Sequence, residues 1–297
     1  MVNNHIIAFC TLFFLVSQNS AGEIYKYKDQ NGNWVFGDKR NVFNQSAKKL
    51  TIKKKTRELN RPVLVTHKKD STHQLIVINP YHAPIDLQVQ SEAFQQGFLR
   101  KTISANTKEV LYENYHSVPE YKYRWILGDP KASPSDDPYL FPVGSKQAYR
   151  ITQSFKGRFS HTREPNVYSV DIAMPIGAYI SAARAGTVIW VKDDYAMGGA
   201  KAYFLDKANY IKVLHDDGTY AVYAHILQGT AEVKPGDTVI QGQKLARAGS
   251  SGYSTGPHLH FVIRQNQGFT SQSVPFNFLS DNGQVFTPKA GMVIKVR

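Results

Sequence analysis

The alternation of apolar and polar residues along the chain predicts short β-strands. Near the start, residues 23–28 alternate, residues 29–33 supply turn formers around Asn-Gly, and residues 34–36 are apolar again. Two such runs joined by Asn-Gly are typical of a β-hairpin. No long stretch repeats its apolar residues with the 3.6-residue period of a helix, so we expect a mainly β protein with antiparallel sheets.

Two further groups of strands are expected after the hairpin. Between residues 60 and 122, apolar runs at 75–80, 85–89 and 109–112 are separated by turn residues, which predicts a small sandwich-like β domain. Residues 129–138 contain three prolines and are interpreted as a linker. The third group of strands is expected at 180–191, 210–214, 220–225, 244–248 and 259–264, with a hairpin over 233–245.

The N-terminal segment is apolar but short. Residues 6–16 form an apolar run broken by one Thr, and small and polar residues follow up to Gly22. A run of this length is below the roughly 20 residues that span a bilayer and is typical of a secretory signal peptide. We therefore expect residues 1–22 to be removed on export. The only cysteine, Cys10, lies in this segment, so we expect a mature chain without disulfides or a transmembrane segment.

The charge of the chain favours anionic partners. The formal net charge is +13, and an exported basic protein is attracted to envelope polymers and lipid phosphates. Part of this charge lies in residues 48–57, which are interpreted either as a solvated linker or as a docking segment. No nucleic-acid-binding motif accompanies the basic stretch, so nucleic acid is not expected as a partner.

The most informative short motif is His258-Leu259-His260, which precedes the β-prone residues 261–263. Side chains on a strand alternate between its two faces, so the two imidazoles are expected to point the same way. A same-face histidine pair at a strand end can supply half of a zinc site, or one member can carry protons. The alternative is a pair of surface histidines without a function.

Three other residues have contexts that suggest chemistry. His161 follows the glycine-flanked loop 157–160, and His225 ends the apolar run 220–224. Asp171 lies within an apolar strand, where a carboxylate is costly to bury unless it meets a cation. These residues complete a set of candidate metal ligands and proton carriers with the histidine pair.

The order of motifs resembles that of the lysostaphin/LytM-type zinc metallopeptidases, over roughly residues 139–278. The matching runs are Val-Asp-Ile-Ala-Met-Pro-Ile-Gly at 170–177, Ala-Ala-Arg-Ala-Gly-Thr-Val at 182–188, Tyr-Ala-His at 223–225 and Ser-Thr-Gly-Pro-His-Leu-His-Phe at 254–261. A single motif of this kind arises easily by chance, whereas four in the same order do not. The stretch 24–39 also resembles a small hairpin module of bacterial envelope proteins, which implies no chemistry.

The resemblance implies a division of roles among the candidate residues. His161, Asp171 and His260 would bind Zn²⁺, while His225 and His258 would be the catalytic histidines. Three protein ligands with a fourth position open to water is the usual form of a catalytic zinc site. One catalytic imidazole would take a proton from the attacking water, and the other would stabilise the oxyanion or protonate the leaving amine.

One spacing departs from the family pattern. Many members separate the first His from the Asp by three residues, whereas nine separate His161 from Asp171, and Val167 occupies the usual position. We keep His161 as the expected ligand, because longer insertions at this point resemble a subgroup variant. His215, the other histidine nearby in sequence, is interpreted as a packing or supporting residue.

The loop 192–207 is long for a connection between strands and is expected either to flank the site or to have no role. Within it, Tyr195, Tyr203 and Phe204 are candidates for contacting substrate. Asn209, directly before the next strand, is expected to hydrogen-bond near the site. His67, His73, His82 and His116 have no ligand-like spacing and are expected to be ordinary surface or packing residues.

Together these features predict an exported zinc metalloendopeptidase that cuts the peptide crosslinks of peptidoglycan in the bacterial periplasm or outside the cell. Two alternatives remain open: a non-enzymatic LytM-type activator of another cell-wall hydrolase, and a secreted peptidase of Gly-rich proteins. The expected organisation is a signal peptide at 1–22, a hairpin module with a basic linker at 23–58, a β domain at 60–122, and a metallopeptidase domain at 139–297.

Overall fold

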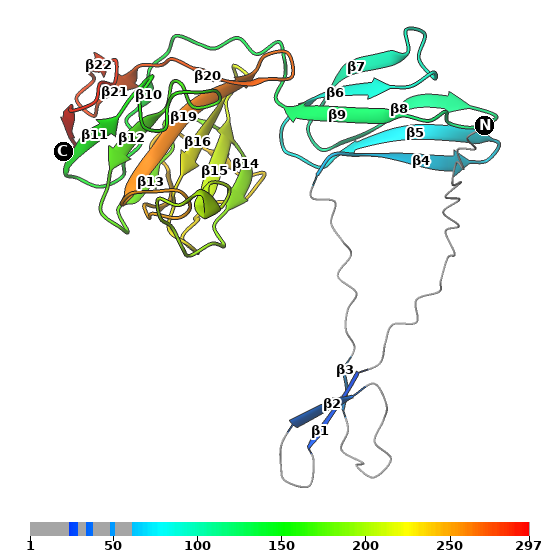
Figure 1. The fold of residues 1–297 in the computed structure, drawn as a ribbon, viewed down its shortest axis with the longest axis horizontal. Coiled ribbons are helices and arrows are strands. Elements are labelled where there is room, and N and C mark those ends of the chain that lie inside the picture. Colours follow the sequence, from blue (N-terminus) through cyan, green and yellow to red (C-terminus); the bar gives the residue numbers. More distant parts are fainter. Residues whose placement is uncertain (1–23, 29–33, 38–47, 51–60, 297) are drawn as a thin grey trace, which may run out of the picture. The chain divides into compact units, whose positions relative to one another are not determined.

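The computed structural model describes residues 24–28, 34–37, 48–50 and 61–296. The expected signal peptide, the Asn-Gly turn and most of the basic stretch lie outside the described residues. The described residues fall into two compact units, one made of residues before Glu58 and the other containing residues 61–296. Almost all regular structure is β-strand, and the described residues contain one single-turn 3₁₀ helix, Ala202–Phe204, and no α-helix (Figure 1). The predicted antiparallel, mainly β fold class is confirmed.

A small three-stranded sheet occurs near the N-terminus. Strands β1 (Ile24–Lys28) and β2 (Trp34–Gly37) pair antiparallel, with Lys28 opposite Trp34. Strand β3 (Lys48–Leu50) pairs with the other edge of β1. Residues 48–50 were expected in a linker, and the structure places them in this sheet.

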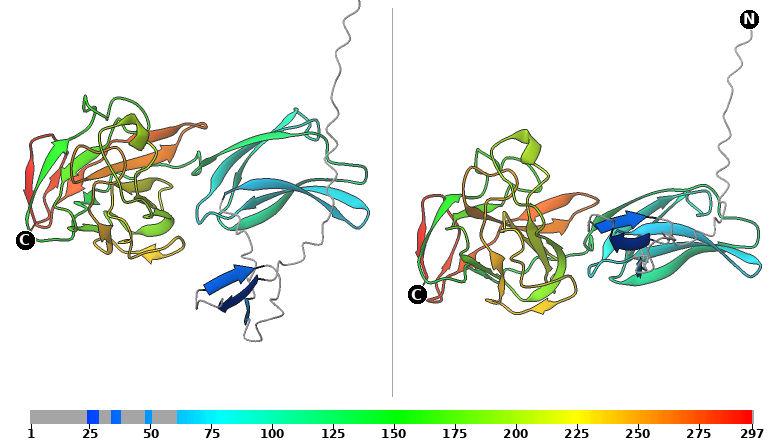
Figure 2. Two further views of the ribbon diagram at one scale, coloured as in Figure 1. Left: turned by 60° about the horizontal axis from the view of Figure 1, so that its bottom comes forward. Right: turned by 90° about the horizontal axis from the view of Figure 1, so that it is seen from below.

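Residues 63–127 form two antiparallel three-stranded sheets that enclose one apolar core (Figure 2). One sheet has the order β4-β5-β8, and the other has the order β7-β6-β9. Alternate residues of the central strands β5 and β6, such as Leu75, Val77, Ile85 and Leu87, fill the space between the sheets. The strands are β4 (Val63–Lys69), β5 (Thr72–Asn79), β6 (Ile85–Gln90), β7 (Phe98–Ile103), β8 (Thr107–Asn114) and β9 (Lys122–Leu127).

The C-terminal half is built around a nine-stranded antiparallel sheet with the order β17-β14-β15-β16-β19-β12-β11-β23, in which β20 also pairs with β19. Its central strand β19 is the longest. The strands are β11 (Ala148–Gln153), β12 (Val170–Ala173), β14 (Gly186–Lys192), β15 (Tyr210–Leu214), β16 (Tyr220–Ala224), β17 (Thr238–Val239), β19 (His258–Asn266), β20 (Ser271–Val274) and β23 (Val293–Lys295).

Two smaller sheets complete this half. Strands β13 (Tyr179–Ser181) and β18 (Lys244–Arg247) form an antiparallel ribbon. Strand β21 (Phe278–Leu279) pairs in parallel with β10 (Tyr139–Leu140) and antiparallel with β22 (Val285–Phe286). None of the described residues lies in a helix long and apolar enough to cross a membrane.

Two strand predictions need correction. The single strand expected at 180–191 is divided between β13 and β14, because residues 182 and 183 leave the ribbon to accept hydrogen bonds from Gly242 and Leu140. The hairpin expected over 233–245 does not form. The turn expected to connect its strands is bonded to Ala182 instead. The Gly242 N–H donates to the Ala182 carbonyl, and the Ala182 N–H donates to the Gln243 carbonyl. Strand β17 therefore pairs with β14, while β18 pairs with β13.

The two faces of the nine-stranded sheet have different environments. Leu259, Phe261 and Ile263 point from β19 into the main apolar core. The alternate residues of the same strand include His258, His260 and Arg264, which line a cleft on the opposite face. The sheet therefore separates the main hydrophobic core from a face that carries the candidate chemistry beside a smaller apolar cluster, which includes Val222 and Val262.

The linker and the preceding β domain are in contact with this half of the chain. Ser133 and Ser135 donate backbone hydrogen bonds to Asp217, so the predicted linker contacts the turn between β15 and β16. The buried Asn266 side chain donates to Asp86 Oδ2 and to the Gly128 carbonyl, at 3.1 Å each. These contacts are consistent with the single compact unit.

Candidate metal centre

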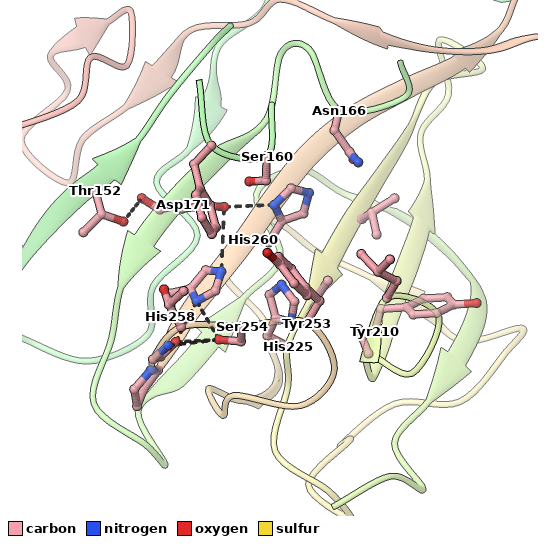
Figure 3. Close-up of a pocket in the computed structure, with 18 of the residues that line it drawn as sticks. Thr152, Ser160, Asn166, Asp171, Tyr210, His225, Tyr253, Ser254, His258 and His260 are labelled. Atoms are coloured by element: carbon pink, nitrogen blue, oxygen red, sulfur yellow. Dashed lines mark hydrogen bonds and ion pairs between the residues drawn. The ribbon is translucent and has the colours of Figure 1, made fainter. Parts of the chain in front are cut away.

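Adjacent strands bring Asp171 and His260 together. In the β12–β19 register, Asp171 lies opposite His260 and Ala173 lies opposite His258. Strand alternation directs Asp171 away from the core that holds its neighbours Val170 and Ile172. Figure 3 shows Asp171, His258 and His260 directed into the same cleft. The predicted same-face orientation of the histidine pair is observed.

His225 reaches this face by a local change of the backbone. Strand β16 ends at Ala224, which lies opposite His260, so a regular strand would turn the next side chain toward the core. His225 instead has a φ of 66°, in the left-handed region that is uncommon for residues other than glycine. Its ring then lies 4.5 Å from the His258 ring and 5.9 Å from the His260 ring, between centroids.

Three candidate metal-ligand atoms lie close together in the cleft. Asp171 Oδ1 lies 3.2 Å from His161 Nε2 and 2.9 Å from His260 Nδ1. The ligand atoms of these three residues all lie within 4.8 Å of one another. Despite the insertion that separates it from Asp171 in sequence, the loop between β11 and β12 carries His161 to this position.

The hydrogen bonds of His161 show that this cluster suits a cation. His161 Nδ1 lies 2.9 Å from the Ser154 carbonyl oxygen, which can only accept, so this nitrogen carries the proton in the neutral ring. Nε2 then presents a lone pair to the Asp171 carboxylate, so two acceptors face each other. A metal ion between these two acceptors would take an electron pair from each of them. Two imidazoles and one carboxylate form a ligand set that zinc accepts.

The other two histidines are held in the complementary orientation. His225 Nδ1 lies 2.6 Å from the Ser251 carbonyl oxygen, and His258 Nδ1 lies 2.8 Å from that of Gly256. Both rings therefore use Nδ1–H as the donor when neutral and leave Nε2 as an acceptor. His258 Nε2 is 3.9 Å from Asp171 Oδ1, so its free nitrogen faces the cluster.

Burial and charge determine the protonation of the cluster. Burial raises the pKa of Asp171, but its electrostatic interactions with the His161 and His260 rings outweigh this effect and leave the pKa well below its usual range. Burial, together with the neighbouring His258 and His260, lowers the pKa of His225 to about 3. Burial also lowers the pKa of His260. Near neutral pH the cluster therefore combines an ionised Asp171 carboxylate with neutral imidazoles at His225 and His260.

A family model describes the part of the chain that holds most of these residues. The model of peptidase family M23 matches residues 166–272. This segment belongs to peptidase family M23. The match includes Asp171, His225, His258 and His260 but begins after His161. The name M23 domain denotes here the C-terminal half built on the nine-stranded sheet, in which the loop between β11 and β12 supplies His161.

Several characterised and uncharacterised proteins share this region. The chain is 36% identical over 128 residues to the peptidoglycan DD-endopeptidase ShyB of Vibrio cholerae, covering 41% of this chain and 26% of that protein. It is 34% identical over 119 residues to lysostaphin of Staphylococcus staphylolyticus (39% and 22% covered). It is 32% identical over 126 residues to an uncharacterized metalloprotease of Buchnera aphidicola (41% and 30% covered). The aligned region therefore covers less than a third of each of these relatives.

Gln153 supports both the carboxylate and the histidine loop of the M23 domain. Its Nε2 donates to Asp171 Oδ2 at 2.8 Å and to Ser160 Oγ at 2.7 Å, and its Oε1 accepts from the backbone N–H of Phe159. A Cβ at Gly157 would lie 2.4 Å from Gln153 Cγ, so this close approach requires glycine. Sequence analysis did not identify Gln153, because a polar residue at a strand end carries no distinctive signal.

The cleft has a volume of about 810 Å³. Phe159 and Tyr253 stack at its rim, with ring centroids 6.2 Å apart. The surface continues from the histidines along the sheet to Tyr210, Lys212 and Arg264. The M23 domain therefore presents an extended, open cleft along this face of the sheet.

The long loop contributes to this cleft through residues other than those expected. Leu205 and Asp206 line it, whereas Tyr195, Tyr203 and Phe204 are not among the lining residues. The Tyr203 and Phe204 rings contact each other, 5.1 Å apart. The expected flanking role of the loop is thus observed, but its aromatic residues are not the ones that reach the cleft.

Two other predictions concern buried polar residues. The side chain of Asn209 is near the site, but it is fully engaged with the backbone of Tyr195 and Ile226 and so acts as a scaffold. His215 is buried, donates from Nδ1 to the Ala185 carbonyl and lies 5.6 Å from the Tyr139 ring. Its interpretation as a packing residue is consistent with these contacts.

Proposed function

We propose that this protein is an exported zinc endopeptidase that hydrolyses peptide crosslinks of bacterial peptidoglycan. The observation that carries the proposal is the convergence of His161 Nε2, Asp171 Oδ1 and His260 Nδ1 beside two further histidines in an open cleft. The similarity of the M23 domain to a peptidoglycan DD-endopeptidase and to lysostaphin supports the choice of substrate.

In this proposal His161, Asp171 and His260 hold the zinc ion. Two neutral imidazoles and one carboxylate would leave a net charge of +1 at the site with zinc bound, and the His225 ring lies beside the rings of His258 and His260. When bound, zinc supplies Lewis acidity that makes water a better nucleophile and polarises the scissile carbonyl. Gln153 restrains the carboxylate by its bond to Asp171 Oδ2, which leaves Oδ1 as the ligand atom.

His225 and His258 are the proposed proton carriers. Their Nδ1–H groups are held by backbone carbonyls, so each ring presents Nε2 in a defined orientation. One Nε2 accepts a proton from the attacking water, and the other stabilises the oxyanion or delivers a proton to the leaving amine. The low pKa of His225 keeps its imidazole neutral across the physiological range, so its Nε2 lone pair is not occupied by a proton.

The proposed setting of this activity is the bacterial envelope. Residues 1–22 would direct export and be removed, residues 23–58 and 60–122 would be accessory modules, and residues 139–297 would be the catalytic domain. The net charge of +13 supports attraction of the protein to anionic envelope polymers. The role of the first accessory module is tested by comparing how tightly the protein binds cell-wall sacculi with and without residues 23–58.

The catalytic proposal is tested with purified mature protein and cell-wall sacculi. We expect zinc-dependent release of muropeptides, identified by mass spectrometry, and its loss on chelation. Zinc-loaded protein that leaves the crosslinks intact would contradict the proposal. If that protein instead increases the activity of another hydrolase, the activator alternative is supported, and cleavage of a Gly-rich protein alone would support the secreted-peptidase alternative.

A further inference from the structure

The cleft contains a lysine that the proposed chemistry does not use. Lys212 lies in the middle of β15 and lines the same cleft as the histidines. In the register of the sheet it is opposite Val222 of β16, which is itself opposite Val262 of β19. Lys212 is therefore two strands away from β19 and two residues further along the sheet than His260.

Lys212 lacks a compensating negative charge. Within residues 61–296, no ion pair or hydrogen bond is formed by its ammonium group, whose nearest ring neighbours are Tyr210 and Tyr220, at 5.4 and 5.6 Å from Nζ. Burial and the nearby Arg264 charge lower the pKa of Lys212 to about 8. The free protein thus holds a partly buried cation in a position that disfavours it.

Arg264 adds positive charge beside Lys212 but is engaged differently. Its Nε donates to the Pro165 carbonyl at 3.0 Å, and its Nη2 donates to Asn166 Oδ1 at 2.6 Å. Both acceptors are uncharged. The carboxylate of Glu164, which also lines the cleft, accepts two hydrogen bonds from Ser273. Arg264 therefore holds the loop at Pro165 and Asn166, while the Lys212 ammonium group remains available to bind a ligand.

We propose that Lys212 forms an anion-binding subsite that recognises a carboxylate of the substrate peptide. This inference rests on the proposed function and specifies which peptides the cleft prefers. The ligand supplies the negative charge that the protein does not, and a carboxylate is the anionic group that peptides carry. A charge-assisted hydrogen bond to the ammonium group, flanked by two tyrosine rings, then selects acidic over amidated peptides.

The sheet geometry defines where that carboxylate lies relative to the bond that is cut. Two strand spacings are about 10 Å, and two residues along a strand are about 7 Å, which together place Lys212 roughly 12 Å from His260. An extended peptide spans this distance with about three to four residues. The recognised carboxylate therefore belongs to a residue several positions from the scissile bond, or to an equally long branch.

The test uses two crosslinked stem-peptide probes that are identical except that the carboxylates are free in one and amidated in the other. Binding is measured by fluorescence anisotropy on the zinc-loaded full mature chain with His225→Ala, which prevents turnover but retains all three proposed ligands. We expect about tenfold tighter binding of the free-carboxylate probe, and we expect Lys212→Met to remove this preference. Lys234→Met, a change of an exposed lysine outside the cleft, provides the matched charge control and should retain it.

Several outcomes would overturn the subsite. These are equal binding of the two probes by the parent, binding of neither, or an unchanged preference in Lys212→Met. Thermal unfolding of Lys212→Met checks that the variant is folded, and we expect no loss of stability because an unpaired cation is removed. If the probes bind with Lys212-dependent preference but the wild-type protein cleaves neither, the subsite stands and the endopeptidase proposal fails.

Discussion

Asp171 and His260 are direct cross-strand partners, with Asp171 Oδ1 2.9 Å from His260 Nδ1. Their separation is therefore set by the hydrogen-bonded backbones of β12 and β19, and elements of this kind hold functional groups more precisely than loops do. His161, by contrast, is supplied by a loop. This loop is positioned by its bond to the Ser154 carbonyl and by the contacts of Gln153. In the proposed zinc site, two ligands are therefore fixed by paired strands, whereas the position of His161 depends on the contacts of its loop.

The histidine pair should separate metal binding from turnover. We expect His260→Ala to lose zinc, because it removes a ligand, and His258→Ala to retain zinc but lose activity by about 10²- to 10⁴-fold, the usual contribution of a proton carrier. Zinc per chain is measured by elemental analysis, and turnover is measured by muropeptide release. Equal zinc loss in both variants would show that His258 is a ligand as well.

Gln153→Ala tests the support of the ligands. Loss of the bonds to Asp171 Oδ2 and to the loop should lower zinc affinity about 10- to 100-fold, as expected for residues that orient metal ligands. The affinity is measured by competition with a chelator. Thr152→Val is a suitable control, because the Thr152 hydroxyl donates to the backbone oxygen of Asp171 and not to its carboxylate, so its loss should change the affinity much less. Equal effects of the two changes would argue against a specific role for Gln153.

Tyr223→Phe tests a buried hydrogen bond between β16 and the turn after β13. The fully buried Tyr223 hydroxyl accepts from the Ala183 N–H at 2.8 Å. Its removal leaves that donor unpaired in the core, so we expect the free energy of unfolding to fall by about 1–3 kcal/mol. Urea denaturation provides the measurement. Tyr203→Phe, at an exposed position, should change stability by less than about 0.5 kcal/mol, and a similar loss in both variants would contradict the assignment.

His215 should make stability depend on pH. Burial lowers its pKa in the folded protein; the nearby Arg184 acts in the same direction, whereas the Ala185 carbonyl, Asp216 and Asp217 oppose it. The unfolded chain then binds more protons below about pH 6.5, so this contribution to stability is present above that pH and is lost as the pH falls, by at most about 1.4 kcal/mol per pH unit.

The comparison with His215→Asn isolates this effect. Asparagine is uncharged and can donate to the same carbonyl, so the variant should lose less stability between pH 7 and pH 5 than the wild-type protein. Denaturant unfolding at several pH values measures the difference. Identical slopes would show that His215 does not titrate in this range.

Local sequence patterns were sufficient to predict several strands and the common orientation of the histidine pair. Residues 210–214 were predicted as a strand and form β15 with the same bounds, because their alternation matches one buried and one open face. The spacing of His258 and His260 determined their common orientation for the same reason. The family also followed from the sequence, since its motifs are short and lie largely within single elements.

How distant segments complete the site depends on long-range contacts. His161 lies in an insertion whose length gives no distance to Asp171, and its position depends on contacts with Gln153 and Ser154 that alternation cannot encode. The φ of His225 reverses the face that its position in the run implies. Lys212 is an ordinary polar residue in the sequence, and only the strand order places it in the cleft of the histidines. The residue types and the local direction of their side chains follow from the order of amino acids, whereas the pairing of distant strands and loops determines which side chains meet.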